Sequence, residues 1–433
     1  MDGDTQQKFS EGLLQYLNDS PTAYHAVENA AEILKEHDFQ ELKETMEWSL
    51  QKGGRYFVTK NQSGIVAFTV GDGNLASEGF RIIGAHTDSP NFKIKPGPCT
   101  VTPDGYVKVN VEVYGGAILS TWFDRPLAVA GRVIVKENTE LKERLVKIDK
   151  PIFMIPNLCI HFQRDVNKNC SYDKQKDIFP LLCLKEDCVD KSDYLLNLIQ
   201  QETDTDKSNI LDYELFLYEY QKGMFVGKDK EFISASRIDN LAMVYIGLSA
   251  LAESADKGKA YRVFAAFDNE EVGSTTAPGA NSGFLMYTLN RICKNLGLTD
   301  DGYFRAVANS TSISADSAHA VHPNYSDKHD PENRPVLGGG PTIKYSAAQK
   351  YGTTAFSAAY FMEACERAGV PCQKYVNRND IAGGSTIGPS ISSLTTIPTV
   401  DMGTPILAMH SIREFGAVID HVYTKMAFLA YLK

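Results

Sequence analysis

The sequence lacks the features that would anchor it in a membrane or mark it as a repetitive chain. None of its apolar stretches approaches the roughly 20 residues that a membrane-spanning helix needs. It also contains no low-complexity tract and no internal repeat. These absences favour an ordinary globular protein. With 433 residues, the chain exceeds the size at which a single hydrophobic core keeps growing, so we expect two domains.

Positive charge is scarce as well. Lysine and arginine number 44 against 54 aspartates and glutamates, which gives a net charge of −10. No run of lysine and arginine is dense enough to follow a phosphate backbone. This balance argues against nucleic acid and anionic membrane as partners, and small molecules or peptides fit better.

Closely spaced cysteine pairs are also absent. No C-x-x-C motif occurs, and no apolar signal segment precedes Phe9. We therefore expect reduced thiols with packing roles in a cytoplasmic protein. The eight cysteines are Cys99, Cys159, Cys170, Cys183, Cys188, Cys293, Cys365 and Cys372.

The first part of the chain mixes helical and strand patterns. Apolar residues recur at helical spacing over residues 9–17 and 26–34. Three strand patterns follow at residues 56–58, 64–70 and 80–85. This mixture predicts helices packed on a sheet.

The pattern changes at about Lys95 and changes back at about Lys228. Between them the chain is β-rich, with only one short helical pattern around residues 195–199. We predict that residues 95–228 form an inserted domain and that residues 1–94 and 229–433 form one discontinuous domain. The strand patterns of the insertion are at residues 107–113, 127–135, 152–162 and 213–220.

After the insertion, helical and strand patterns alternate to the end of the chain. This alternation predicts an α/β fold of three layers, interrupted by the β-rich insertion. Helical patterns cover residues 241–251, 285–296, 355–368 and a closing helix from about 415; strand patterns cover residues 263–267, 306–308, 374–376 and 396–401.

An apolar run at Val263–Phe267 ends abruptly in carboxylates, which predicts a buried strand that opens into a functional loop. In extended backbone, neighbouring side chains point to opposite sides, so Glu270 and Glu271 suit different tasks. One can hold a metal ion while the other moves a proton. The alternative is a solvated acidic turn after a strand.

Five metal-competent residues fall at the ends of predicted elements: His86, Asp239, Glu271, Asp316 and His410. Singly, each also suits a structural role, such as a hydrogen-bonded histidine or a helix-capping aspartate. Together they suit a two-metal site, because one bridging aspartate lets five residues supply three ligands to each zinc. Asp88 could orient His86, or it could serve only the turn before Ser89-Pro90.

Five longer motifs occur along the chain in a characteristic order. They are G-A-H-T-D-S-P at 84–90, S-R-I-D-N at 236–240, D-N-E-E-V-G-S at 268–274, S-A-D-S-A-H-A-V-H-P-N-Y at 314–325 and M-H-S-x-R-E at 409–414. On these motifs the chain resembles the aspartyl aminopeptidase family of co-catalytic zinc metallopeptidases. The resemblance extends from Ser20-Pro21-Thr22 to the C-terminal helix.

The resemblance implies an enzyme that removes the N-terminal residue, with a preference for Asp or Glu, from peptides with a free N terminus. It implies two divalent ions per subunit, zinc above all, although cobalt or manganese would suit such ligands. His86, Asp239 and Asp316 would hold one ion, and Asp239, Glu271 and His410 the other, with Glu270 as the general base. The inserted domain would mediate dimerisation within a tetrahedral dodecamer.

The resemblance also implies residues that contact substrate. His161 would reach the active site of a neighbouring subunit, whereas its apolar neighbours alone are more typical of a core histidine. Lys344 and Tyr351 would line the pocket for the first side chain, where a cation favours Asp or Glu; the alternative is a surface lysine after a turn. We expect structural or outer-shell roles for His319 and His322.

Two alternative functions stay open at this stage. One is a dinuclear zinc peptidase of neutral or broad specificity, and the other is a catalytically silent assembly or binding protein. The complete ligand set together with Glu270 speaks against the silent protein. The sequence lacks the N-terminal propeptide of vacuolar relatives, which is a second reason to expect a cytoplasmic location.

Overall fold

The computed structural model describes residues 3–186, 189–191, 193–254 and 258–433. Within them the chain forms two compact units. Unit 1 comprises Met1–Asp88, Gly223–Met409 and Glu414–Lys433. Unit 2 comprises Ser89–Lys222 and the short segment His410–Arg413.

A nine-stranded sheet forms the middle layer of unit 1. Its central strands β13, β4, β14 and β18 pair in parallel, and they are almost entirely buried because helices cover both faces. The carboxyl ends of these strands therefore meet at one edge of the sheet. In spatial order the strands are β1 (Gln40–Leu42), β2 (Arg55–Lys60), β3 (Gly64–Thr69), β13 (Tyr261–Phe267), β4 (Phe80–His86), β14 (Thr311–Ala315), β18 (Thr399–Gly403), β16 (Thr342–Tyr345) and β17 (Gln373–Val376).

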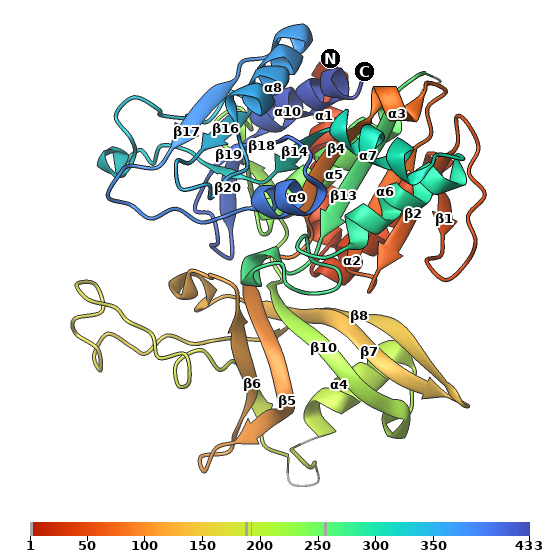
Figure 1. Ribbon diagram of the computed structural model, residues 1–433. Helices are drawn as coiled ribbons and strands as arrows, with labels where there is room; N and C mark the ends of the chain where they lie inside the picture. The colour runs from red at the N-terminus through yellow and green to blue at the C-terminus, as the bar shows by residue number, and fades with distance from the viewer. Residues whose placement is uncertain (1–2, 187–188, 192, 255–257) are drawn as a thin grey trace. The chain divides into compact units, whose positions relative to one another are not determined.

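Two hydrophobic cores lie on opposite faces of this sheet. Successive residues of β13 alternate between them: Phe264 and Ala266 pack into one core, while Val263 and Ala265 pack into the other. Helices α1 (Gly3–Asp19), α2 (Ala23–Glu36), α5 (Ile238–Glu253), α8 (Ala355–Ala368) and α10 (Val418–Tyr431) contribute to the first core. Helices α3 (Leu75–Glu78), α6 (Phe284–Asn295), α7 (Asp300–Ala308) and α9 (Ile387–Thr395) contribute to the second. The predicted three-layer α/β fold is confirmed (Figure 1).

A smaller sheet of unit 1 carries several of the candidate residues on its connections. Its β12 leads into Asp239, and its β15 begins two residues after Asp316. In spatial order its strands are β11 (Met224–Val226), β12 (Phe232–Ala235), β20 (Glu414–Ala417), β19 (Pro405–Leu407) and β15 (Ala318–His319).

Unit 2 is built on a six-stranded antiparallel sheet, and helix α4 (Asp193–Thr203) packs into the same core. Val107, Val109 and Val111 of β6 are buried while the residues between them are not, which explains the alternating pattern of the sequence. The β-rich insertion is thereby confirmed. The strands in spatial order are β8 (Glu140–Phe153), β7 (Leu127–Glu137), β10 (Ile210–Glu219), β5 (Asn91–Val101), β6 (Tyr106–Tyr114) and β9 (Leu181–Leu184).

Two of the predicted elements are wrong. Residues 306–308 end helix α7 rather than form a strand, because Thr299 caps this helix by accepting a hydrogen bond from the Gly302 N–H. The strand expected at residues 152–162 stops at Phe153, and Pro156 then removes a backbone donor. Most of β8 lies in the polar stretch before it, which an alternating apolar pattern does not reveal.

Two expectations from composition can be compared with the structure. No helix in the described part of the chain is both long enough and apolar enough to cross a membrane. The cysteines in that part, seven of the eight, are all free thiols. Cys188 lies outside the described residues.

Candidate metal centre

The strand order of the main sheet assembles the centre. His86 is the last residue of β4, and Asp316 directly follows β14, the parallel neighbour of β4. The Glu270-Glu271 pair follows β13, which pairs with β4 on its other side. Three segments far apart in the sequence therefore deliver polar side chains to the same edge of the sheet, as parallel strands do.

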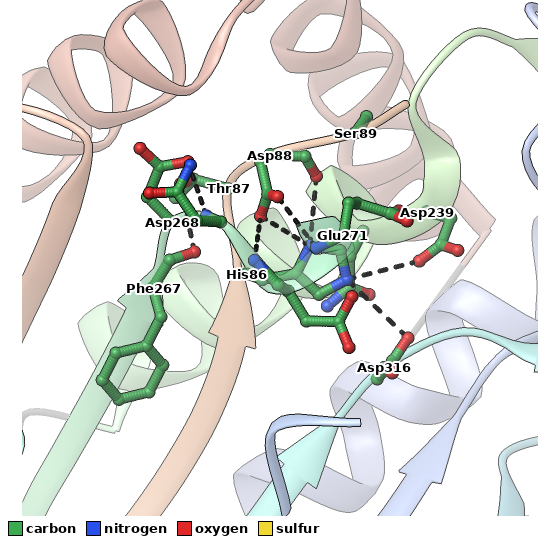
Figure 2. A network of polar contacts seen from close by, with 12 residues as sticks. His86, Thr87, Asp88, Ser89, Asp239, Phe267, Asp268, Glu271 and Asp316 are labelled. Carbon is green, nitrogen blue, oxygen red and sulfur yellow. Dashed lines mark hydrogen bonds and ion pairs between the residues drawn. The ribbon is translucent and has the colours of Figure 1, made fainter. Parts of the chain in front are cut away.

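Three buried side chains surround one point. His86 Nε2 lies 3.6 Å from Asp239 Oδ1 and 3.9 Å from Asp316 Oδ1, and these ligand atoms all lie within 4.8 Å of one another (Figure 2). These separations are longer than the donor–acceptor distances of good hydrogen bonds. They are close to the roughly 3.3–3.6 Å between ligand atoms bound 2.0–2.2 Å from one tetrahedral zinc ion. One imidazole and two carboxylates are also ligand types that zinc accepts.

Asp88 supports this group in two ways. His86 Nδ1 donates to the carbonyl oxygen of Asp88 at 3.1 Å and lies 3.3 Å from its carboxylate. A proton held on Nδ1 leaves the lone pair of Nε2 facing Asp239 and Asp316, which is the tautomer that binds metal. The two carboxylate oxygens of Asp88 accept hydrogen bonds from the backbone N–H groups of Glu270 at 3.1 Å and Glu271 at 3.0 Å. One aspartate thus joins the histidine to the acidic loop.

The acidic loop is not extended, so the reasoning from opposite side-chain directions is wrong. Glu270–Val272 form a 3-10 turn (η3), and carboxylate atoms of Glu270 and Glu271 lie within 4.8 Å of each other and of a His86 ring nitrogen. Asn269 and Ser274 adopt left-handed backbone on either side. Such backbone is rare outside glycine and clusters at functional sites. Separate roles for the two glutamates stay a prediction.

Two buried residues that sequence reasoning missed hold Asp239 and Asp316 in place. The backbone N–H of Asp239 donates to Glu414 Oε2 at 2.8 Å. The side chain of Asn240 donates to the carbonyl of Ala315, the residue before Asp316, at 2.8 Å. Both residues end motifs quoted above, S-R-I-D-N and M-H-S-x-R-E, and this position was the only available signal for them.

The electrostatics of the group call for a cation. Burial lowers the pKa of His86, but Asp239, Asp316, Asp88 and Glu270 together raise it well above its usual value. Burial raises the pKa of Glu270 to about 8; His86 opposes this rise, and Asp316, Asp88 and Asp239 add to it. The site holds excess negative charge that a proton or a divalent ion can balance. The donor set therefore fits a metal ion.

Lys344 lies beside this group and is almost fully buried, which rules out a surface lysine. Its Nζ donates to the Ser317 carbonyl at 2.8 Å, lies 3.5 Å from Asp316 Oδ2, and sits 5.5 Å from the centre of the Tyr351 ring. A buried ammonium needs such partners. Lys344 and Tyr351 are therefore neighbours, as a shared pocket requires.

The remaining histidines differ in position. His161 is exposed in an irregular segment of unit 2, which excludes a core histidine. His410 is grouped with unit 2, where its Nδ1 donates to the Gly116 carbonyl at 3.2 Å, and its role as a ligand stays a prediction. His319 and His322 line a cavity of about 300 Å³ with Tyr375. Neither occurs in a metal-competent group of the described residues.

Replacing Asp88 with alanine should weaken zinc binding roughly 10- to 100-fold, because the outer partner that fixes His86 and the acidic loop would be lost. Competition with a chromophoric chelator measures the dissociation constant directly. Asp104→Ala, at an exposed aspartate, is the matched control. Unchanged zinc affinity in Asp88→Ala would show that His86 is oriented by other groups.

Comparison with known proteins identifies a family of zinc enzymes. The family model described as aminopeptidase I zinc metalloprotease (M18) matches residues 16–432. A probable M18 family aminopeptidase 2 of Clostridium acetobutylicum is 50% identical over 423 residues, which cover 97% of this chain and 98% of the relative.

Solved structures agree at the level of the fold. The chain is similar to one in the cryo-EM structure of the Ape4 and Nbr1 complex, with a TM-score of 0.95, 38% identity, and coverage of 99% of this chain and 86% of the other. It is also similar to the mApe1 dodecamer of S. cerevisiae, with a TM-score of 0.87, 26% identity, and coverage of 99% and 97%. The chain belongs to the M18 family and is a zinc aminopeptidase, a metallo-exopeptidase.

Proposed function

We propose that this enzyme removes N-terminal Asp or Glu from peptides by means of two divalent ions, zinc above all, and a glutamate base. The observation that carries the proposal is the buried group of His86, Asp239 and Asp316, with Lys344 Nζ 3.5 Å from Asp316. A metal-competent group lies next to a buried cation, which suits a substrate whose first side chain is an anion.

In this proposal His86, Asp239 and Asp316 hold one ion, and Asp239, Glu271 and His410 hold the other. Several local features support His410. Its backbone φ of +67° is strained for a non-glycine residue, as is common at functional sites. The segment it begins ends just before Glu414, which holds the backbone of Asp239. Bound ions would lower the pKa of a water molecule and polarise the scissile carbonyl.

Glu270 acts as the general base in the proposed mechanism. It lies within 4.8 Å of a His86 ring nitrogen, and the Asp88 carboxylate fixes its backbone. Its carboxylate accepts a proton from the attacking water and returns it to the leaving amine. Its pKa, raised by burial and by neighbouring acids, makes it a good proton acceptor near neutral pH once cations offset part of that negative charge.

We also propose an assembly. Residues 95–228 would act as a dimerisation domain within a tetrahedral dodecamer, and His161 would complete the active site of a neighbouring subunit. Two observations support this: the similar mApe1 is a dodecamer, and the residues beside His161 are apolar yet exposed, with Ile160 at 48% and Phe162 at 80%. The free cysteines support a cytoplasmic location.

Lys344→Met tests the acidic specificity. We expect the wild type to favour Asp or Glu over Leu or Ala by roughly ten- to hundred-fold in kcat/KM, because a charge-assisted contact contributes about 1.5–3 kcal/mol. The variant should lose much of this preference through slower cleavage of acidic substrates alone. Kinetics on a panel of peptides with different N-terminal residues measure it.

Lys350→Met is the control, since Lys350 is an exposed lysine nearby. It should keep the wild-type preference. A wild-type enzyme that favours leucyl or alanyl peptides would refute the proposed preference for N-terminal Asp or Glu. The function would then be that of a dinuclear aminopeptidase of neutral or broad specificity.

Mixed assemblies test the delivery of His161 in trans. Neither His161→Ala nor Glu270→Gln subunits alone should be active. Assemblies refolded from both should recover part of the activity, because some sites would combine an intact Glu270 with an intact His161 from a neighbour. Native mass spectrometry verifies the mixing, and mixed particles without recovered activity would contradict the proposal.

A further inference from the structure

Strand β18 carries a fully buried aspartate, Asp401, that the mechanism above does not use. In the sheet it lies next to β14, where Ser314 is its partner, two residues before Asp316. On the other side β18 pairs with β16 through Thr342↔Gly403 and Ile343↔Met402. Lys344 is the next residue of β16 after Ile343, and its charge acts on the Asp401 carboxylate. Asp401 thus lies between the strand that leads to a candidate metal ligand and the strand that carries the candidate pocket lysine.

The carboxylate of Asp401 joins two loops. The backbone N–H of Gly352 donates to Oδ2 at 2.5 Å, and the hydroxyl of Thr386 donates to Oδ1 at 2.6 Å. Gly352 directly follows Tyr351, and Thr386 caps helix α9. The backbone N–H of Asp401 also donates to Thr353 Oγ1 at 2.9 Å. Each oxygen of the carboxylate therefore holds a different segment.

The Asp401 carboxylate packs closely against Gly388, where a larger residue would clash with it. A Cβ added to Gly388 would lie 2.1 Å from Asp401 Oδ2, closer than any side chain can approach, so this glycine keeps the space open. Burial raises the pKa of Asp401, while hydrogen bonds from Thr386 and the Gly352 N–H and the charge of Lys344 favour its ionised form. A buried charge with these partners resists movement, since leaving any of them unpaired costs free energy.

We propose that Asp401 is a positioning residue for the first side-chain pocket: it fixes the segment that carries Tyr351, the neighbour of Lys344, and ties this segment to the Thr386 loop. The inference rests on the proposed function, because that proposal places the pocket at Lys344 and Tyr351. Asp401 touches no reacting atom. Its loss should therefore weaken substrate binding in the ground state and the transition state alike, which raises KM and spares kcat.

The test compares Asp401→Asn and Thr386→Val with Thr399→Val. Asparagine removes the charge and leaves one acceptor oxygen where the carboxylate has two, so the Gly352 N–H and the Thr386 hydroxyl can no longer both donate to this side chain. Thr386→Val keeps the carboxylate but removes its hydroxyl donor, together with the hydroxyl that caps helix α9. Thr399 is also fully buried on β18, but its hydroxyl donates only to the Ile397 carbonyl, so its variant controls for general damage to the strand. KM and kcat are measured on peptides with N-terminal Asp, Glu, Ala and Leu, together with zinc content.

Asp401→Asn should raise KM for the preferred peptide by roughly 10- to 100-fold. Thr386→Val should raise it less, and the control should leave it near the wild-type value. In both test variants kcat and zinc content should stay near wild type. Unchanged KM in both, or an equal rise in Thr399→Val, would overturn the role of Asp401. A fall in kcat at constant KM would also overturn it.

The two proposals can fail separately. If the wild type prefers neutral residues, the acidic specificity is wrong, and the KM of Asp401→Asn on the preferred neutral peptide still decides whether Asp401 organises the pocket. If the wild type prefers acidic residues and KM is unaffected, the specificity stands and the role of Asp401 falls.

Discussion

Replacing Glu270 with glutamine should lower kcat roughly 100- to 10,000-fold, because an amide cannot accept the proton of the attacking water. The change keeps the size and shape of the side chain. It also leaves every proposed ligand in place, and the hydrogen bond from the Glu270 N–H to Asp88 does not depend on the side chain. Zinc content should therefore match the wild type. Steady-state kinetics and elemental analysis of the same preparation measure both quantities.

Glu271→Gln is the matched comparison, since its backbone is held by the other oxygen of Asp88. As a proposed ligand of the second ion, Glu271 should affect zinc content as well as rate. Normal turnover in Glu270→Gln, or zinc lost from it and retained in Glu271→Gln, would mean that the roles of the two glutamates are exchanged or wrong.

Removal of the metal should lower kcat at least about a thousand-fold, because metal ions contribute several kcal/mol of transition-state stabilisation. Zinc returned to the chelated enzyme should restore the rate, with about two ions bound per chain if the dinuclear proposal is right. Isothermal titration gives the stoichiometry, and parallel assays follow the recovered activity.

Two ligand variants separate a bridged pair of ions from a single ion. Asp239→Asn should lose most of both ions, because Asp239 would bind each of them, while Asp316→Asn should retain about one ion per chain. Both side chains are buried and lie at similar distances from His86 Nε2, so the comparison is well matched. If the two variants lost the same number of ions, or if the wild type bound only one ion per chain, the proposal that Asp239 bridges two ions would be refuted.

Local pattern was sufficient for much of the fold. The periodicity at residues 355–368 corresponds to α8, and the apolar run at Val263–Phe267 corresponds to β13. Local pattern failed at residues 306–308, where an alanine-rich helix end resembles a short buried strand. It also failed in β8, because the polar first part of this strand has no buried face and so shows no alternation of apolar and polar residues. Periodicity reports burial, so it identifies an element only where one face is buried and another is not.

The sequence by itself determined the family, because its motifs are contiguous and need no fold to be recognised. Only the tertiary structure decided that His86, Asp239 and Asp316 meet, that Asp88 holds both His86 and the acidic loop, and that Lys344 is buried against Asp316. These facts depend on the strand order β13-β4-β14 and on the antiparallel register of β16 with β18. Long-range pairing sets both, and no local run of residues encodes the distance between segments that only the sheet brings together.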